Sequence, residues 1–214
     1  HKARQKAVAW AVHGFTTSGI VLGFLGLVAV FEGKQEVAFI FMALALFVDG
    51  IDGTLARLAK VTQVTPQVDG ASLDNVVDMF NYSVLPALMI YWFEMVPEQF
   101  LIPAAAAILA VSCYTFADTS MKTSDYYFKG FAAFWNLLVL FFFLLETSHL
   151  TNLITIVICC MSELGTNKNI VIYSSSILSA LLAAAWCSTM RKPYCLLCSR
   201  DTFFKEAALG RPKV

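Results

Sequence analysis

The chain alternates long apolar runs with short polar connectors. At about 20 residues per membrane crossing, the runs predict helices over 8–31, 37–59, 73–93, 100–117, 128–146 and 150–161, with a further apolar run at 170–188. Connectors such as "EGKQE" and "EMVPEQ" are so short that neighbouring helices must lie antiparallel in one bundle. The pattern therefore predicts an all-α, polytopic membrane helix bundle of about six transmembrane helices drawn from seven hydrophobic segments.

Composition agrees with a lipid environment. Of the 214 residues, 58% are hydrophobic and 14% are charged, whereas soluble domains carry roughly 25% charged residues. The formal net charge is zero, so no overall charge recruits nucleic acid, and membrane lipids are the expected surroundings. Cys195 and Cys198 have no second cysteine pair or histidine cluster that would complete a zinc site, so we interpret them as free thiols.

Basic residues predict the orientation of the bundle. Alternation of antiparallel helices places the following residues on one side of the membrane: Lys2, Arg4, Lys6, Arg57, Lys60 and Lys122. By the positive-inside rule this side is cytoplasmic. We expect residues 1–190 to form one transmembrane domain and the basic tail at 191–214 to be cytoplasmic, which requires that the run at 150–161 does not cross the membrane alone.

Acidic residues gather at the cytoplasmic ends of two neighbouring predicted helices. Asp49 and Asp52 are three residues apart on one helical face, and Asp74 and Asp78 are four residues apart on the next helix. Four carboxylates in a membrane repel one another and are costly to bury, so a bound cation explains them better than protonation does. Oxygen ligands without nearby His or Cys favour Mn²⁺ or Mg²⁺ over zinc, and the spacing excludes an EF-hand. Asp69, in the connector, is expected to cap a helix or to pair with an arginine.

These residues resemble the signature of the CDP-alcohol phosphatidyltransferase family. The signature is Asp-x2-Asp-Gly-x2-Ala-Arg, a spacer, and Gly-x3-Asp-x3-Asp, and it is filled here by Asp49, Asp52, Gly53, Ala56, Arg57, Gly70, Asp74 and Asp78. The spacer is a few residues longer than the commonest family form. The stretches "AWAVHGFTTSG", "LDNVVDMFNY" and "ADTSMKTSDYYFKGFAAFWN" extend the resemblance over roughly the first 160 residues. Within the family, the chain is most similar to bacterial members that use choline.

The resemblance implies an enzyme of the bacterial inner membrane whose active site faces the cytoplasm. Such an enzyme transfers the phosphatidyl group of CDP-diacylglycerol to an alcohol and releases CMP. The resemblance further implies that the four aspartates hold Mn²⁺ or Mg²⁺ and that Asp78 is the catalytic base. It assigns contacts with the nucleotide and its diphosphate to Asp49, Gly53, Ala56, Arg57 and Gly70. The small residues Gly53 and Ala56 would let a nucleotide approach the helix backbone, and tight helix packing is the alternative explanation for them.

The alcohol acceptor is predicted from aromatic and acidic residues on the cytoplasmic half. A quaternary ammonium group cannot donate a hydrogen bond, so aromatic faces or a carboxylate must hold it. Candidates for binding choline in this way are Tyr82, Tyr114, Asp118, Trp135 and Asn136. Glycerol phosphate would need a basic cluster that the loop with Arg57 and Lys60 lacks, and serine would need a further cationic partner. The motif itself does not separate choline from these two alternatives.

A stripe of small residues follows one face of the first predicted helix. Gly19, Gly23 and Gly26 lie on or near this face, and small residues let membrane helices approach closely. The stripe indicates packing either inside the bundle or between two copies in a homodimer. His13, a lone histidine near the membrane surface, is interpreted as structural. A channel or transporter would also bury carboxylates, but it would show broken helices near the membrane midplane instead of an acidic group at one surface.

Overall fold

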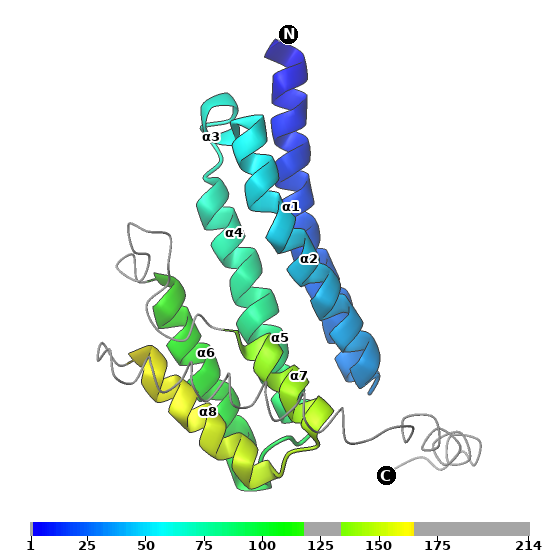
Figure 1. The fold of residues 1–214 in the computed structure, drawn as a ribbon, viewed down its shortest axis with the longest axis vertical. Coiled ribbons are helices and arrows are strands. Elements are labelled where there is room, and N and C mark those ends of the chain that lie inside the picture. Colours follow the sequence, from blue (N-terminus) through cyan, green and yellow to red (C-terminus); the bar gives the residue numbers. More distant parts are fainter. Residues whose placement is uncertain (1, 118–133, 165–214) are drawn as a thin grey trace, which may run out of the picture.

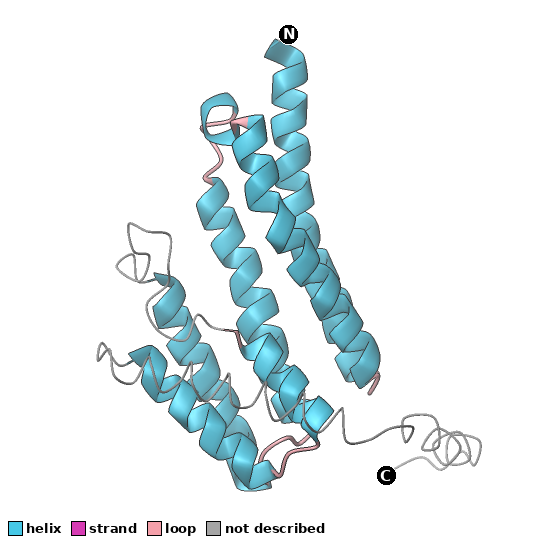
Figure 2. Ribbon diagram, viewed as in Figure 1, coloured by secondary structure: helices cyan, strands magenta, loops and turns pink. Residues whose placement is uncertain are grey.

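The structure is a computed structural model that describes residues 2–117 and 134–164 (Figure 1). These two ranges consist of helices joined by turns and contain no strand (Figure 2), which confirms the all-α bundle. Asp118, the run at 170–188 and the tail at 191–214 lie outside the described residues.

Two long antiparallel helices begin the chain. α1 (Lys2–Phe31) and α2 (Gln35–Ala59) lie side by side along most of their length (Figure 1). Gly33 closes the turn between them at φ +71°, a left-handed conformation that glycine adopts without a steric penalty. α2 ends at Lys60 in the same region of backbone space, and the short helix α3 (Val61–Val64), which the sequence did not predict, follows at once.

The third predicted span is one helical rod built in three parts. α4 (Gly70–Met79) runs into a π-helical turn, η1 (Phe80–Val84), and then into α5 (Leu85–Trp92). The predicted cap is confirmed, because Asp69 accepts hydrogen bonds at its carboxylate from the N–H of Ala71 (3.1 Å) and from the hydroxyl of Ser72 (2.6 Å). The cap fixes where the rod begins.

The remaining described elements are the turn η2 (Glu98–Phe100), α6 (Leu101–Ala117), α7 (Trp135–Leu145) and α8 (His149–Leu164). α6 and α7 pack against the rod, and α8 packs against α6. Three stretches are long and apolar enough to cross a membrane: Lys2–Phe31, Gln35–Ala59 and Glu98–Ala117. Within the described ranges, α7 and α8 are apolar but have 11 and 16 residues, fewer than the roughly 20 of a full crossing. The protein is a helical membrane protein.

The main apolar core lies around α5, α6 and α7. Its largest side chains with less than 2% exposure include Trp135, Leu85, Met89, Ile108 and Leu138. A second, small cluster of Ala9, Val12 and Val61 lies at the end of the bundle where α1 begins. The core therefore holds one half of the bundle together and leaves the other half more open.

The predicted glycine stripe packs inside the bundle. A Cβ atom built on Gly19 would stand 2.9 Å from Val77, and one built on Gly26 would stand 2.9 Å from Leu85. At Gly23 the added atom would overlap with Asn81 of the π-helical turn. Real Cβ atoms do not approach so closely, so α1 contacts the rod directly because these three positions carry no side chain.

Gly23→Ala is expected to lower the free energy of unfolding by about 1–3 kcal/mol, because the added methyl group must displace Asn81 and Phe80. Gly14→Ala is the matched control on the same helix, since nothing lies within 4 Å of its Cβ position; it should be neutral or stabilise by up to about 1 kcal/mol. Thermal unfolding in detergent compares the two variants. Equal unfolding temperatures would show that the close approach at Gly23 is wrong.

Candidate active site

The candidate site lies at the end of the bundle where α1 begins, α2 ends and α4 begins (Figure 1). Asp49 and Asp52 are on the last turns of α2, and Asp74 and Asp78 are on α4. The two helices supply carboxylates from opposite sides because the chain reverses direction through α3 and the Asp69 cap. The connection between α2 and α4 therefore brings the two parts of the signature, residues 49–57 and 70–78, to face each other.

Three of the four aspartates form a tight cluster. Asp49, Asp74 and Asp78 are half-buried, and each offers one carboxylate oxygen such that all three atoms lie within 4.8 Å of one another. Carboxylates this close repel when all are ionised. A set of three oxygen donors from two helices fits a divalent cation that prefers oxygen ligands, such as Mg²⁺ or Mn²⁺. The three donors therefore fit such a cation, and the metal site of four aspartates stays a prediction.

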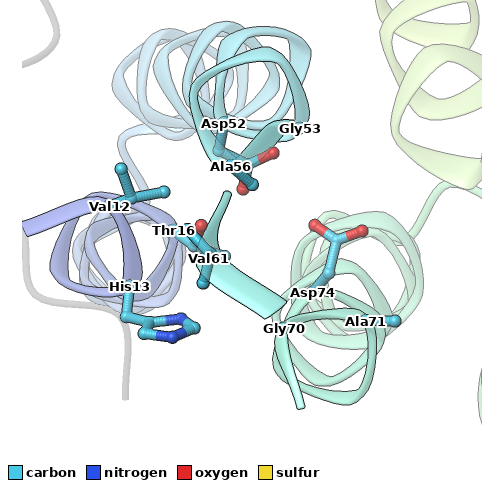
Figure 3. Close-up of a pocket in the computed structure, with 10 residues that line it drawn as sticks. All are labelled: Val12, His13, Thr16, Asp52, Gly53, Ala56, Val61, Gly70, Ala71 and Asp74. Atoms are coloured by element: carbon cyan, nitrogen blue, oxygen red, sulfur yellow. The ribbon is translucent and has the colours of Figure 1, made fainter. Parts of the chain in front are cut away.

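Asp52 lies beside this cluster instead of within it. Its side chain is 6% exposed and faces the hydroxyl of Thr16 on α1. In Figure 3, Asp52 projects from α2 toward Asp74 across the pocket. The four carboxylates thus divide into a cluster of three and a fourth on the wall of the adjoining pocket.

The pocket has a volume of about 180 Å³ and lies between α1, α2, α3 and α4 (Figure 3). Its lining consists of Val12, His13, Thr16, Asp52, Gly53, Ala56, Val61, Gly70, Ala71 and Asp74. Three residues predicted to contact a nucleotide, Gly53, Ala56 and Gly70, are therefore in the wall. They carry little or no side chain, so the pocket exists where larger residues would close it.

Arg57 lies one turn past Gly53 on the exposed surface. Its Nη2 donates a hydrogen bond to Thr54 Oγ1 at 3.0 Å, and its Nη1 lies 3.5 Å from the Cβ position of Gly53. The guanidinium therefore lies over the glycine that lines the pocket, although Arg57 is not itself in the lining. A long charged side chain in this place can reach an anionic group bound at Gly53.

His13 connects α1 to the loop that precedes α4. Its Nε2 lies 3.1 Å from Oγ1 of the fully buried Thr65, and the Thr65 hydroxyl donates to the carbonyl of Val61 at 3.1 Å. A hydroxyl has one hydrogen, so His13 Nε2 must carry the hydrogen that it donates to Thr65. The structural role expected for His13 agrees with this contact, and His13 also forms a wall of the pocket.

Thr16 is a pocket residue that the sequence analysis missed. It lies one turn after His13 on α1, so both point to the same side of that helix. The available signal was the polar stretch "HGFTTSG" at 13–19 within a long apolar run. That signal is weak, because a threonine in a membrane helix can instead bond to its own backbone.

The acceptor candidates lie in different surroundings. Tyr82 is 6% exposed, and its hydroxyl donates to Asp49 Oδ2 at 2.6 Å. Tyr114 lies on α6 with 61% of its side chain exposed. Asp118, the fourth residue after Tyr114, lies outside the described residues. Among the candidates that the structure describes, Tyr82 is the one joined to the carboxylate cluster by a hydrogen bond.

Trp135 and Asn136 face the core. Trp135 is wholly buried, and its indole N–H donates to Ser112 Oγ at 2.8 Å. Asn136 is 4% exposed, and its side-chain oxygen accepts from the N–H of Leu137 at 2.9 Å. The structure therefore brings these two residues to the inside of the bundle, where they support the neighbouring helices.

Known proteins match most of the chain. Residues 13–187 match the family model described as CDP-alcohol phosphatidyltransferase, so the match extends past residue 160, where the resemblance was expected to fade. The chain is 37% identical over 156 residues to the phosphatidylcholine synthase of Borreliella burgdorferi, covering 73% of this chain and 67% of that protein. It is 40% identical over 164 residues to the phosphatidylcholine synthase of Pseudomonas aeruginosa, covering 77% and 69%.

A third relative, the phosphatidylcholine synthase of Rhizobium meliloti, is 43% identical over 143 residues, which cover 67% of this chain and 59% of the relative. The matches therefore span between about three fifths and two thirds of these relatives' own lengths. No solved structure matches the chain.

Mn²⁺ is expected to raise the unfolding temperature of the purified protein, because a cation that binds the folded cluster stabilises the native state. Asp74→Asn should weaken Mn²⁺ binding at least about tenfold, since it removes one ligand charge, and should reduce the shift in unfolding temperature. Glu98→Gln is the control, because Glu98 is an exposed acidic residue in η2, away from the cluster. An unfolding temperature that responds to neither Mn²⁺ nor Mg²⁺ would contradict the metal site.

Proposed function

The chain belongs to the CDP-alcohol phosphatidyltransferase family, and from this premise we propose that it transfers the phosphatidyl group of CDP-diacylglycerol to choline and releases CMP. The observation that carries the proposal is the cluster of Asp49, Asp74 and Asp78 beside a pocket lined by small residues. Relatives named phosphatidylcholine synthase support choline as the acceptor.

The pocket suits the nucleotide half of the substrate. Gly53, Ala56 and Gly70 would leave room for the cytidine and the diphosphate of CDP-diacylglycerol to approach the helix backbones. Arg57, which lies over Gly53, would turn from Thr54 to donate charge-assisted hydrogen bonds to diphosphate oxygens. α2 connects the two parts of the site, since its Asp49 lies in the cluster and its Gly53 and Ala56 line the pocket.

The cluster suits phosphoryl transfer. Mn²⁺ or Mg²⁺ held by Asp49, Asp74 and Asp78, with Asp52 on the pocket side, would neutralise negative charge that develops on the diphosphate as CMP leaves. Arg57, beside the pocket, would hold the diphosphate next to the acceptor and help to keep it in line for attack.

Asp78 is the proposed catalytic base. Its carboxylate takes the hydroxyl proton of choline while the choline oxygen forms a bond to the β-phosphorus of CDP-diacylglycerol. The bond between that phosphorus and the bridging oxygen breaks, and CMP departs with the electron pair. Asp78 is half-buried on the rod beside Asp74 and Asp49, close to where the diphosphate would bind.

The choline site is proposed to lie next to the cluster. Its trimethylammonium group would be held by aromatic faces and a carboxylate, drawn from the candidates Tyr82, Tyr114 and Asp118. The ring of Tyr82 packs edge-on against Phe134 with centroids 6.2 Å apart, and Phe134 is 39% exposed. Trp135 and Asn136 would support this site from the core instead of facing choline directly.

The site is proposed to face the cytoplasm at a bacterial inner membrane. The proposal is supported by Lys2, Arg4 and Lys6 on α1 and Lys60 at the end of α2, which lie at the same end of the bundle as the pocket (Figure 1). Basic residues are enriched on the cytoplasmic side of membrane proteins. Residues 1–190 are proposed as one transmembrane domain, with 191–214 as a cytoplasmic tail. A homodimer would need a surface other than the glycine stripe, which packs against the rod.

The purified protein with CDP-diacylglycerol and Mn²⁺ is expected to release CMP when choline is added, but not when serine or glycerol phosphate is added. Excess chelator should abolish the release and Mn²⁺ should restore it, because the carboxylate cluster then has no cation. Chromatography of CMP and of the lipid product measures the outcome. Serine or glycerol phosphate outcompeting choline would overturn the choice of acceptor, and full activity in chelator would overturn the role of the cluster.

Asp78→Asn is expected to lower turnover by about 10²–10⁴-fold, because the amide cannot accept the proton of choline. The affinity for CMP should change by less than about threefold, since the pocket lining does not include Asp78. Glu36→Gln is the control, because Glu36 is an exposed acidic residue at the opposite end of α2. Normal turnover in Asp78→Asn would require another residue to be the base.

A further inference from the structure

A hydrogen bond from the π-helical turn of the rod reaches Asp49 of the carboxylate cluster. The hydroxyl of Tyr82 donates to Asp49 Oδ2 at 2.6 Å, across 33 residues of sequence. Tyr82 is 6% exposed and does not line the pocket. The phenol therefore contacts a predicted metal ligand from a buried position outside the pocket lining.

The π-helical turn explains why Tyr82 reaches Asp49. Asp74, Asp78 and Tyr82 follow one another at intervals of four residues along the rod. In an α-helix each step of four residues drifts about 40° around the axis. In η1 the N–H of Leu85 bonds to the carbonyl of Phe80, five residues earlier, and this wider turn reduces the drift. Tyr82 thus stays on the face of the rod that carries the two aspartates.

The opposite side of the π-helical turn is held by α1. Asn81, 4% exposed, donates from Nδ2 to the carbonyl of Gly19 at 3.1 Å. The absence of a side chain at Gly23 makes room for Asn81 and Phe80. Because neighbouring residues of the same turn contact α1 on one side and α2 on the other, the turn cannot rotate without breaking one of the two contacts.

We infer that Tyr82 is a positioning residue that orients Asp49 for metal binding, an inference that rests on the proposed function for its metal-dependent chemistry. The phenol holds Oδ2 of Asp49 and so fixes the plane of the carboxylate with respect to Asp74 and Asp78. Partners of this kind behind metal ligands typically contribute 10–100-fold to metal affinity. The sequence analysis assigned Tyr82 to choline, and the hydrogen bond gives its hydroxyl a different role.

Tyr82→Phe tests the role of the hydroxyl, because it removes one oxygen and keeps the ring. The affinity for Mn²⁺, measured by electron paramagnetic resonance without CDP-diacylglycerol or choline, is expected to fall about 10–100-fold. Turnover should fall at limiting Mn²⁺ and recover at saturating Mn²⁺, with the KM for choline unchanged there. Tyr91→Phe is the matched control on the same rod, since Tyr91 is 42% exposed and lies away from the cluster; its Mn²⁺ affinity should equal that of the unaltered protein.

A double-mutant cycle connects the effect to Asp49. If the hydroxyl acts through that carboxylate, adding Tyr82→Phe to Asp49→Asn should weaken Mn²⁺ binding by less than about twofold beyond Asp49→Asn alone. Effects that multiply would overturn the inference. An unchanged Mn²⁺ affinity in Tyr82→Phe would also overturn the inference. If the KM for choline were then raised at saturating Mn²⁺, the hydroxyl would belong to the acceptor site.

Two features keep the test decisive. Mn²⁺ binding is measured without substrates, so a protein that uses another alcohol leaves this result unaffected and only the proposed function fails. Should Tyr82→Phe unfold below the assay temperature, the unaltered protein provides the second measurement. When Mg²⁺ is titrated into the unaltered protein, the near-ultraviolet absorption of tyrosine should change, and the midpoint of this change should equal the midpoint of Mg²⁺ binding. Tyr91→Phe should show the same change. A tyrosine spectrum that does not respond to Mg²⁺ would overturn the inference.

Discussion

Repulsion between carboxylates in an apolar bundle is the constraint on which this structure depends. Asp49, Asp74 and Asp78 are half-buried and bring three oxygen atoms within 4.8 Å of one another, so their charges are only partly screened by water. A cation can offset that repulsion, and it does so only if the helices that carry the aspartates are held at a fixed separation. The packing of α1 against the rod and the reversal of the chain between α2 and α4 hold α2 and α4 at this separation.

Small residues set the distances between the helices. Gly19, Gly23 and Gly26 let α1 contact the rod directly, so the rod is supported along its length by backbone instead of by mobile side chains. Gly53 and Gly70 have the opposite consequence, because they leave a pocket between α2 and α4. Glycine therefore allows close helix packing at one interface and leaves a cavity at another. Which of the two results depends on whether side chains of a neighbouring helix lie opposite the glycine.

The two halves of the site have different mechanical support. The carboxylate cluster is supported by well-packed elements: the rod is joined to α1 through Asn81 and to α2 through Tyr82. The pocket is built from the ends of helices and the α3 loop, where His13 and Thr65 form a buried polar contact. In the proposed reaction, the support of the cluster would keep the reacting groups in line, and the end of the bundle built from loops would admit and release the nucleotide.

The sequence by itself determined the class of fold, the approximate helices, the Asp69 cap and the set of signature residues. These follow from local rules: the length of apolar runs, the spacing of carboxylates on a helical face and the capping preference of aspartate. The glycine stripe was visible too, but its partner was not, because small residues at helical spacing serve a dimer and a bundle equally.

Only the tertiary structure decided how these residues meet. It separated Asp52 from the cluster of three, placed Thr16 and His13 in the pocket wall and turned Trp135 into the core. It also revealed the π-helical turn, which no residue pattern announced, since the i to i+5 bond at Phe80 depends on α1 and α2 holding the two sides of that turn. Contacts between residues 33 or 62 positions apart are decided by how whole helices pack, and local spacing along the chain carries no information about them.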